Sequence, residues 1–413
     1  MLDINFIRKN QALVEKSARE KGYDVNISEI LSLDDERKEL LQKVEALRQQ
    51  RNELSAQMKG GFNPELVEQA KVIKQQLQDT EPNLSVIEKD LQDKLKQVPN
   101  IIFDDVPLGG EECNAEVATW GEHKTSGVDH VDYATSRGWL DFERGAKVAG
   151  AKFYYLKGDL ALLEQALIQY GIKKITEHGF TFMTVPDMVS GQILEGCGFN
   201  PRSSEQSDEY YIEGEDLAMI ATAEMPLTGY HMDEILDEKD LPLMYAGLSP
   251  CFRKEAGTYG KYTRGLFRVH QFNKLEMYVF CLPEQSPEIH EKIRAIEEEI
   301  WQEIGIPYHV INNAAGDLGA PAAKKYDIEY WSPANQKYQE LTSCSNCTDF
   351  QARSLNIRVR RENGEIVTAH TLNGTAISLA RTLVVMIENF AEEGGKMTIP
   401  EVLRPYLGGR AEI

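Results

Sequence analysis

The residues of this chain that best suit ligand chemistry lie between Pro250 and Phe280. If residues 265–280 form a β-strand, side chains two apart share a face, so one face is apolar and the other polar or aromatic. That second face carries Arg268, His270, Phe272, Lys274 and Glu276. At about 3.3 Å per residue, Glu276 would lie roughly 26 Å from Arg268. We therefore predict a platform for an extended ligand with anionic, flat and ammonium parts.

An upstream strand adds Arg253 and Glu255, which are two residues apart and so share a face. A glycine-bearing loop joins the two strands. It lacks the pattern of a phosphate-binding P-loop, because Tyr262 stands where Ser or Thr is needed and Glu255 where the first glycine is needed. We interpret residues 257–263 as a loop that closes over the ligand.

Arg381 is the only charge in residues 372–387, which read as an apolar helix. A helix that is apolar on all sides is buried, and an unpaired buried cation is costly. Arg381 must therefore meet an anion, either a structural glutamate or a phosphate of a ligand.

Several motifs, taken in order, resemble those of class II aminoacyl-tRNA synthetases in their seryl-tRNA synthetase form. Phe-Arg-Lys-Glu-Ala-Gly at 252–257, continued through 263–276, is similar to the second signature motif of that class. Thr-Ala-Glu at 222–224, the segment 340–353 and Asn-Gly-Thr-Ala-Ile-Ser-Leu-Ala-Arg at 373–381 agree in order and spacing. The resemblance covers essentially the whole chain.

The resemblance implies an α+β fold, in which an N-terminal antiparallel coiled-coil arm precedes a class II catalytic domain with an antiparallel β-sheet flanked by helices. The implied limits are residues 1–100 for a tRNA-binding domain, 101–120 for a linker and 121–413 for the catalytic domain. A helix at about 160–178 and a strand at 179–186 match the first class II motif, which implies a homodimer.

Heptad spacing of apolar residues independently predicts a helical hairpin at about 33–98, with a Gly-Gly and Asn-Pro turn in its middle. A spacer or dimerisation coil would show the same pattern. Pro82 predicts a kink or interruption at 80–83, because proline lacks the amide donor. In the family this arm reaches tRNA, which makes basic residues near its tip candidate phosphate contacts: Arg48, Arg51, Lys59, Lys71 and Lys74.

The activity implied by the resemblance is serine–tRNA ligation. ATP would activate L-serine to seryl-adenylate, and the seryl group would pass to the 3′ end of tRNA(Ser), and of tRNA(Sec) where present. Such chemistry needs in-line positioning and charge neutralisation. The implied catalytic residues are Arg253, Glu255 and Arg381.

The resemblance also implies ligand sets. For L-serine they are Thr222, Ala223, Glu224, Arg253, Glu276 and Thr375. For ATP they are Arg253, Lys254, Glu255, Arg268, Val269, Phe272, Glu340, Leu341, Thr342, Ser343 and Arg381. Glu340 and Ser343 would hold Mg²⁺ with ATP, since hard oxygen donors suit that ion. We expect no zinc, because Cys344 and Cys347 lack a second pair at suitable spacing.

Composition sets further bounds. The 413 residues include no run of about 18 apolar residues and no signal-peptide pattern at the start, so we expect a cytoplasmic protein without membrane association. Six scattered cysteines suit a reducing compartment. The net charge is −21, but the first 100 residues hold 16 Lys and Arg against 18 Asp and Glu, which leaves the arm nearly neutral. Phosphate binding needs local cations only.

Three other classes of protein remain as alternatives. A ligase that loads amino acids onto a carrier protein typically lacks the long arm and carries zinc. A catalytically dead paralogue should have lost Arg253, Phe272 or Arg381, and a coiled-coil scaffold would leave the large C-terminal body unexplained. Residues 195–211 depart from the usual family pattern. The family's ordering of a loop over the serine pocket is therefore not carried over to these residues.

Overall fold

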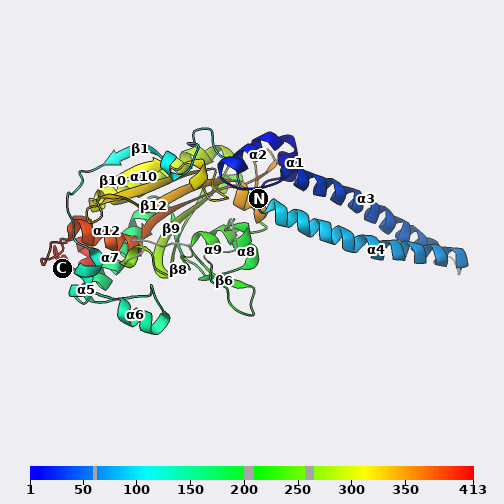
Figure 1. Ribbon diagram of the computed structural model, residues 1–413. Helices are drawn as coiled ribbons and strands as arrows, with labels where there is room; N and C mark the ends of the chain where they lie inside the picture. Colours follow the sequence, from blue (N-terminus) through cyan, green and yellow to red (C-terminus); the bar gives the residue numbers. More distant parts are fainter. Residues whose placement is uncertain (59–62, 200–208, 256–264) are drawn as a thin grey trace. The chain divides into compact units, whose positions relative to one another are not determined.

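The computed structural model describes residues 1–58, 63–199, 209–255 and 265–413. The loop expected at 257–263 lies outside these ranges, as does most of the unusual segment 195–211. The chain separates into two compact units, Leu2–Ile101 and Ile102–Ile413, the second together with Met1 (Figure 1). No helix within the described ranges is both long and apolar enough to cross a membrane.

The N-terminal unit is helical in its described part. Its helices are α1 (Ile4–Lys9), α2 (Gln11–Glu20), α3 (Ile27–Met58) and α4 (Pro64–Leu95). The long pair α3 and α4 forms the hairpin that the heptads predict, closed by a seam of Val44, Leu47, Ile73, Leu77 and Leu84. Asn63 caps α4 by accepting a hydrogen bond from the Glu65 amide, and Pro64 takes the first helical position, where its missing amide costs nothing.

Pro82 lies inside α4, which runs without a break from Pro64 to Leu95. The interruption expected at 80–83 is therefore wrong. Leu77 and Leu84, on either side of Pro82, stay buried in the hairpin seam. Packing against α3 maintains the helix, although the proline removes one of its backbone hydrogen bonds.

The C-terminal unit is built on a mixed sheet of eight described strands that is antiparallel apart from one pair. In spatial order the strands are β1 (Ala115–Trp120), β10 (Tyr308–Asn312), β11 (Lys324–Ser332), β12 (Lys337–Thr348), β15 (His370–Ser378), β9 (Gln271–Cys281), β8 (Leu243–Phe252) and β4 (Thr181–Thr184). The helices associated with it are α7 (Gly158–Glu177), α10 (Ser286–Ile304) and α12 (Leu379–Phe390). The predicted α+β class, with an antiparallel sheet flanked by helices, is confirmed.

Shorter elements complete this unit. The helices are α5 (His130–Ser136), α6 (Phe142–Ala149), α8 (Gly191–Gly196), α9 (Glu224–Gly229) and α11 (Phe350–Ser354). The small sheets pair β2 (Leu140–Asp141) with β3 (Tyr155–Leu156), β5 (Met188–Ser190) with β6 (Leu217–Met219), and β13 (Arg358–Arg360) with both β14 (Ile366–Thr368) and β7 (Ile235–Asp237).

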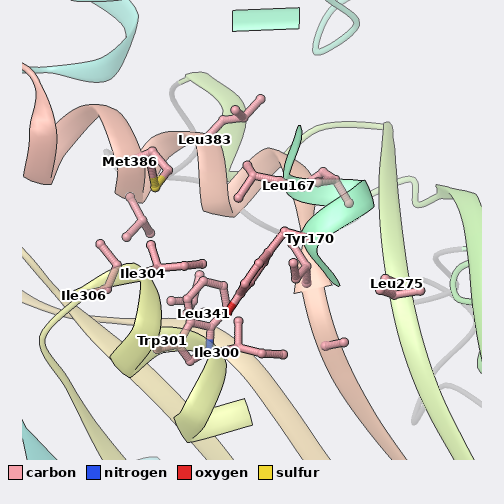
Figure 2. Packing of buried hydrophobic residues seen from close by; sticks show 14 of the residues in the cluster. Leu167, Tyr170, Leu275, Ile300, Trp301, Ile304, Ile306, Leu341, Leu383 and Met386 are labelled. Atoms are coloured by element: carbon pink, nitrogen blue, oxygen red, sulfur yellow. The ribbon is translucent and has the colours of Figure 1, made fainter. Parts of the chain in front are cut away.

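The main hydrophobic core joins α7, α10 and α12 to the central strands. Figure 2 shows Tyr170 of α7 close to Ile300 and Trp301 of α10. Gly171 lets α7 approach the sheet, since a Cβ there would meet Ile377 at 2.7 Å. The side chains of β9 that enter this core alternate with polar ones, so the polar ones point to the opposite face of the sheet.

The strand expected at 265–280 is shorter than predicted. Residues Gly265–Phe267 form a 3₁₀ turn, and β9 begins only at Gln271. Gly265 has a φ of 75°, and the Leu266 amide donates to His130 Nε2 at 3.3 Å. Because this turn interrupts the extended chain, Arg268 and His270 are not on the strand, and the expected span of roughly 26 Å to Glu276 does not apply.

The helix expected at 372–387 is confirmed only from Leu379 onward. Residues 370–378 form β15, which pairs with β9 and β12, and α12 starts at Leu379. A central strand that is buried on both faces has no polar alternation, so its sequence cannot be told from a buried helix. Arg381 therefore lies in the first turn of α12.

Candidate active site

A pocket that is partly open to solvent lies on the polar face of β9, β12 and β15. Strands β9, β12 and β15, the first turn of α12 and the chain between β8 and β9 supply its walls. The sheet register therefore decides which strand side chains meet there. The lining residues are Arg253, Glu255, Leu266, Phe267, Val269, Phe272, Lys274, Glu340, Leu341, Thr342, Ser343, Thr375, Ser378, Ala380 and Arg381.

Arg253 and Phe272 both line the pocket and are in contact with each other. The guanidinium carbon of Arg253 lies 5.3 Å from the centre of the Phe272 ring, within the range of a cation–π contact. The Arg253 Nε donates to the Ala221 carbonyl at 3.4 Å. A planar cation beside an aromatic face suits a ligand that combines an anion with a flat ring.

A second cation, Arg268, is paired with Glu255 at 2.8 Å. Glu255 is in the left-handed region, with a φ of 50°, which is uncommon for a residue with a side chain. The ion pair joins the end of β8 to the chain before β9. Arg268 lies before the first residue of β9, and this ion pair directs its side chain toward Glu255.

Arg381 lies against both Phe267 and Glu340. Its guanidinium carbon is 5.0 Å from the Phe267 ring centre, and its Nη1 is 3.0 Å from Glu340 Oε1. Burial acts to raise the pKa of Glu340, but the charges of Arg381 and Lys325 outweigh it and lower that pKa to about 2. The anion that Arg381 requires is thus a glutamate in this structure, and that glutamate lines the same pocket.

Glu276 is buried beside the pocket and is held by two neighbours. The Thr375 hydroxyl donates to Glu276 Oε2 at 3.1 Å, and Lys274 Nζ lies 2.6 Å from the same oxygen. Cross-strand pairing sets this contact, because Thr375 of β15 is the direct partner of Glu276 on β9. A buried carboxylate with defined hydrogen bonds can select a small hydroxyl group.

Glu224 is a second buried carboxylate, at the start of α9. Its Oε1 accepts hydrogen bonds from Gln351 Nε2 at 2.7 Å and Asn373 Nδ2 at 3.0 Å. Burial raises the pKa of Glu224 to about 7, and the charge of Glu276 adds to that rise. A cationic group that entered here would stabilise the ionised form.

Only some of the predicted site residues line the pocket. Those at the pocket wall are Arg253, Glu255, Val269, Phe272, Glu340, Leu341, Thr342, Ser343, Thr375 and Arg381. Lys254 instead lies over the rings of Tyr210 and Tyr211, at 5.7 and 5.8 Å. Thr222 and Ala223 precede α9, where the Thr222 hydroxyl accepts a hydrogen bond from the Glu224 amide at 3.2 Å.

The structure brings several residues here that are absent from the predicted ligand sets. Lys274, Phe267 and Ser378 line the pocket, and Gln351 and Asn373 hold Glu224. The signal for Lys274 was present, since it lies between Phe272 and Glu276 on one strand face. Gln351 offered no such signal, because its partners come from distant segments.

Within the described residues, no group of three or more His, Cys, Asp or Glu side chains is placed to hold a metal. Glu340 and Ser343 both line the pocket, and Glu340 is ionised at neutral pH. One carboxylate and one hydroxyl suit Mg²⁺ that takes its other ligands from phosphates and water.

Comparisons with known proteins cover both units. Residues 1–102 match the family model described as the seryl-tRNA synthetase N-terminal domain, and residues 208–390 match the class II tRNA synthetase core domain (G, H, P, S and T). Proteins named serine–tRNA ligase from Dictyoglomus thermophilum and Treponema denticola are 46% and 43% identical. Each alignment spans 99% of this chain, with 98% and 99% of the relative.

Two solved structures are similar to this chain over its whole length. Seryl-tRNA synthetase from Pyrococcus horikoshii complexed with ATP has a TM-score of 0.89 at 41% identity, over 100% of this chain and 99% of that one. Cytoplasmic serine–tRNA ligase from Naegleria fowleri in complex with AMP has a TM-score of 0.85 at 32% identity, over 100% and 98%. Because its sequence and its fold both match over essentially the whole length, this chain belongs to the seryl-tRNA synthetase family of class II aminoacyl-tRNA synthetases.

Proposed function

We propose that the protein is a serine–tRNA ligase. In the first step the carboxylate of L-serine attacks the α-phosphorus of ATP, an oxygen–phosphorus bond forms, and pyrophosphate leaves. In the second step a terminal ribose hydroxyl of the tRNA attacks the seryl carbonyl, and AMP leaves. The observation that carries this proposal is one pocket with a cation–aromatic pair, Arg253 and Phe272, close to the Glu276–Thr375 pair.

ATP would occupy the wall that contains Arg253, Phe272 and Arg381. Phe272 would stack on adenine, Arg253 would hold the α-phosphate and the serine carboxylate, and Arg381 would leave Glu340 for the terminal phosphate. The remaining proposed ATP contacts are Lys254, Glu255, Arg268, Val269, Leu341, Thr342 and Ser343. Phosphoryl transfer of this kind relies on such fixed positive charges.

Mg²⁺ would be held by Glu340 and Ser343 together with the phosphates of ATP. When bound, the ion supplies neutralisation of phosphate charge. The charges of Arg381 and Lys325 lower the pKa of Glu340, so its carboxylate is ionised and can pass from Arg381 to the metal ion. We propose no zinc, because Cys344 and Cys347 have no second pair of ligands at suitable spacing for a tetrahedral site.

L-serine would lie between the two buried carboxylates. Glu276 and Thr375 would receive the side-chain hydroxyl, and Glu224, with Thr222 and Ala223, would receive the ammonium group. A site with buried polar groups for a hydroxyl rejects the analogue without it by roughly 10⁴-fold or more, because those groups would then be unpaired.

The partners would be tRNA(Ser), tRNA(Sec) where present, and a second copy of the chain through α7 and β4. The α3–α4 hairpin would bind tRNA with its exposed cations. Arg48 is already paired with Glu81 at 2.8 Å and Lys71 with Glu68 at 3.2 Å, so tRNA phosphates would compete with these exposed pairs. Lys59 lies outside the described residues. A cytoplasmic location would suit the six free cysteines, five of them buried.

Serine-dependent exchange of radioactive pyrophosphate into ATP tests this proposal. We expect exchange with L-serine, at a kcat/KM at least 100-fold above that with alanine, threonine, cysteine or glycine. Charging of tRNA(Ser) with labelled serine should follow. An enzyme that prefers another amino acid, or that shows no exchange with any, would contradict the proposal.

A further inference from the structure

Lys274 is a buried cation on the polar face of β9 that has no part in the proposed ATP or serine contacts. Only 7% of its surface is exposed, and it lines the pocket two residues from both Phe272 and Glu276. Its register partner on β15 is Ser378, another pocket residue. Burying an ammonium group is costly, so its position requires a specific anionic neighbour.

That neighbour is Glu276, and the contact has a definite geometry. Lys274 Nζ and the Thr375 hydroxyl meet the same carboxylate oxygen, Oε2, at 2.6 and 3.1 Å. Two donors from two adjacent strands fix the carboxylate in position. The other oxygen, Oε1, accepts no hydrogen bond from the described residues.

Lys274 also offsets a concentration of acidic groups. Glu276 raises the pKa of two other buried glutamates, Glu224 and Glu297, in each case in addition to the larger effect of burial. Lys274 acts in the opposite direction on Glu224. Without this ammonium group, Glu276 would face two acids with no cation in contact, and its carboxylate would lose its orientation.

We infer that Lys274 is a positioning and specificity-determining residue, which holds Oε2 of Glu276 so that Oε1 remains for the hydroxyl of the amino acid substrate. This inference rests on the proposed serine activation. The preference for serine over alanine then depends on Lys274 through Glu276, and the affinity for ATP does not.

The test is pyrophosphate exchange with Lys274→Met, which keeps the length of the side chain and removes its charge. We expect the KM for serine to rise at least tenfold, the ratio of kcat/KM for serine over alanine to fall at least tenfold, and the KM for ATP to stay within twofold. Lys396→Met is the matched control, because Lys396 is an exposed lysine paired with Glu412. It should change none of these values.

A double variant shows whether Lys274 acts through Glu276. In a Glu276→Gln background the carboxylate is gone, so adding Lys274→Met should change the serine KM less than threefold. If the two effects multiply instead, Lys274 acts independently and the inference is wrong. It is equally wrong if Lys274→Met raises the KM for ATP and leaves the serine-to-alanine ratio unchanged.

Folding and function are separated by two further comparisons. If Lys274→Met loses its thermal transition, Lys274→Leu, which also lacks both the donor and the charge, takes its place and must show the same loss of serine preference. If the unmodified protein shows no serine-dependent exchange, the proposed function fails. If it shows exchange and the Lys274 variants keep full serine preference, only the role of Lys274 fails.

Discussion

Gln351 donates a hydrogen bond from Nε2 to Glu224 Oε1 at 2.7 Å, although 127 residues separate the two in the chain. Its own Oε1 accepts from the hydroxyls of Tyr278 at 2.9 Å and Thr371 at 2.8 Å, and Nε2 also donates to the Cys197 carbonyl at 3.1 Å. Gln351 is fully buried. A flipped amide would place its oxygen against a carboxylate and a carbonyl, so these contacts define one orientation.

Gln351→Leu should raise the KM for serine and leave the KM for ATP nearly unchanged. The substitution removes a donor from a buried carboxylate, which costs about 1–3 kcal/mol, or roughly a 5- to 150-fold weaker interaction with the ammonium group. Pyrophosphate exchange gives both constants. Gln50→Leu, at an exposed helical position of α3, is the control. Equal losses for serine and ATP would contradict a role confined to Glu224.

Serine binding should be stronger at pH 8 than at pH 6. In the free protein the pKa of Glu224 is raised to about 7, so the carboxyl is largely protonated at pH 6 and must lose a proton when the serine ammonium binds. The apparent KM for serine should therefore fall about tenfold between pH 6 and pH 8, and then level. Calorimetry at pH 6.5 in buffers of different ionisation enthalpy should show proton release. A flat profile would contradict the assignment.

The same group affects stability in the opposite direction. Because the folded pKa of Glu224 lies above the ordinary value of 4.5, the folded state binds more protons than the unfolded state between these limits. The contribution of Glu224 to the free energy of unfolding is therefore lost as the pH rises from about 4.5 to about 7. Added serine should restore stability above pH 7, which thermal denaturation with and without serine can measure.

Arg381→Ala should reduce adenylate formation by about 10²–10³, because it removes a fixed cation from the phosphate wall and leaves Glu340 without its partner. Single-turnover formation of seryl-adenylate is the measurement. Arg361→Ala is a suitable control, since Arg361 pairs with Glu284 on the surface at 2.7 Å. Near-normal adenylate formation by Arg381→Ala would show that the residue has only a structural role.

Shortening the arm should separate the two steps of the reaction. All residues that line the pocket belong to the unit Ile102–Ile413, and the α3–α4 hairpin has its own seam. A chain in which residues 41–86 are replaced by a short Gly-Ser turn keeps Asp34 with its partners Arg8, Arg37 and Lys38. We expect pyrophosphate exchange within twofold of the parent and aminoacylation at least 100-fold lower.

Salt dependence supplies the control for that prediction. In the intact protein, tRNA affinity should fall steeply with salt concentration, because contacts between cations and phosphates release bound counterions. The shortened chain should show a smaller slope. A shortened chain that charges tRNA as well as the parent would refute the role of the arm, and one that stays folded but loses exchange would refute the independence of the two steps.

Local sequence determined the elements whose pattern is local. The heptads of the hairpin predicted α3 and α4, and the amphipathic run at about 160–178 predicted α7. Alternation along residues 271–281 correctly placed Phe272, Lys274 and Glu276 on one face, because successive side chains of a strand point to opposite sides. The interruption expected at Pro82 does not occur, since the packing of Leu77 and Leu84 against α3 maintains the helix around it.

Tertiary structure decided everything that depends on sheet register and on contacts between distant segments. Residues 370–378 are a strand because β9 and β12 lie on either side, which no local pattern reveals when both faces are buried. Arg268 leaves the strand because a turn at Gly265 and an ion pair with Glu255 redirect the chain. Lys274 is a local partner of Glu276, but Thr375 of β15 and Gln351 of α11, which bind Glu276 and Glu224, lie about 100 residues or more away. Buried polar groups must be satisfied by whatever the fold places beside them.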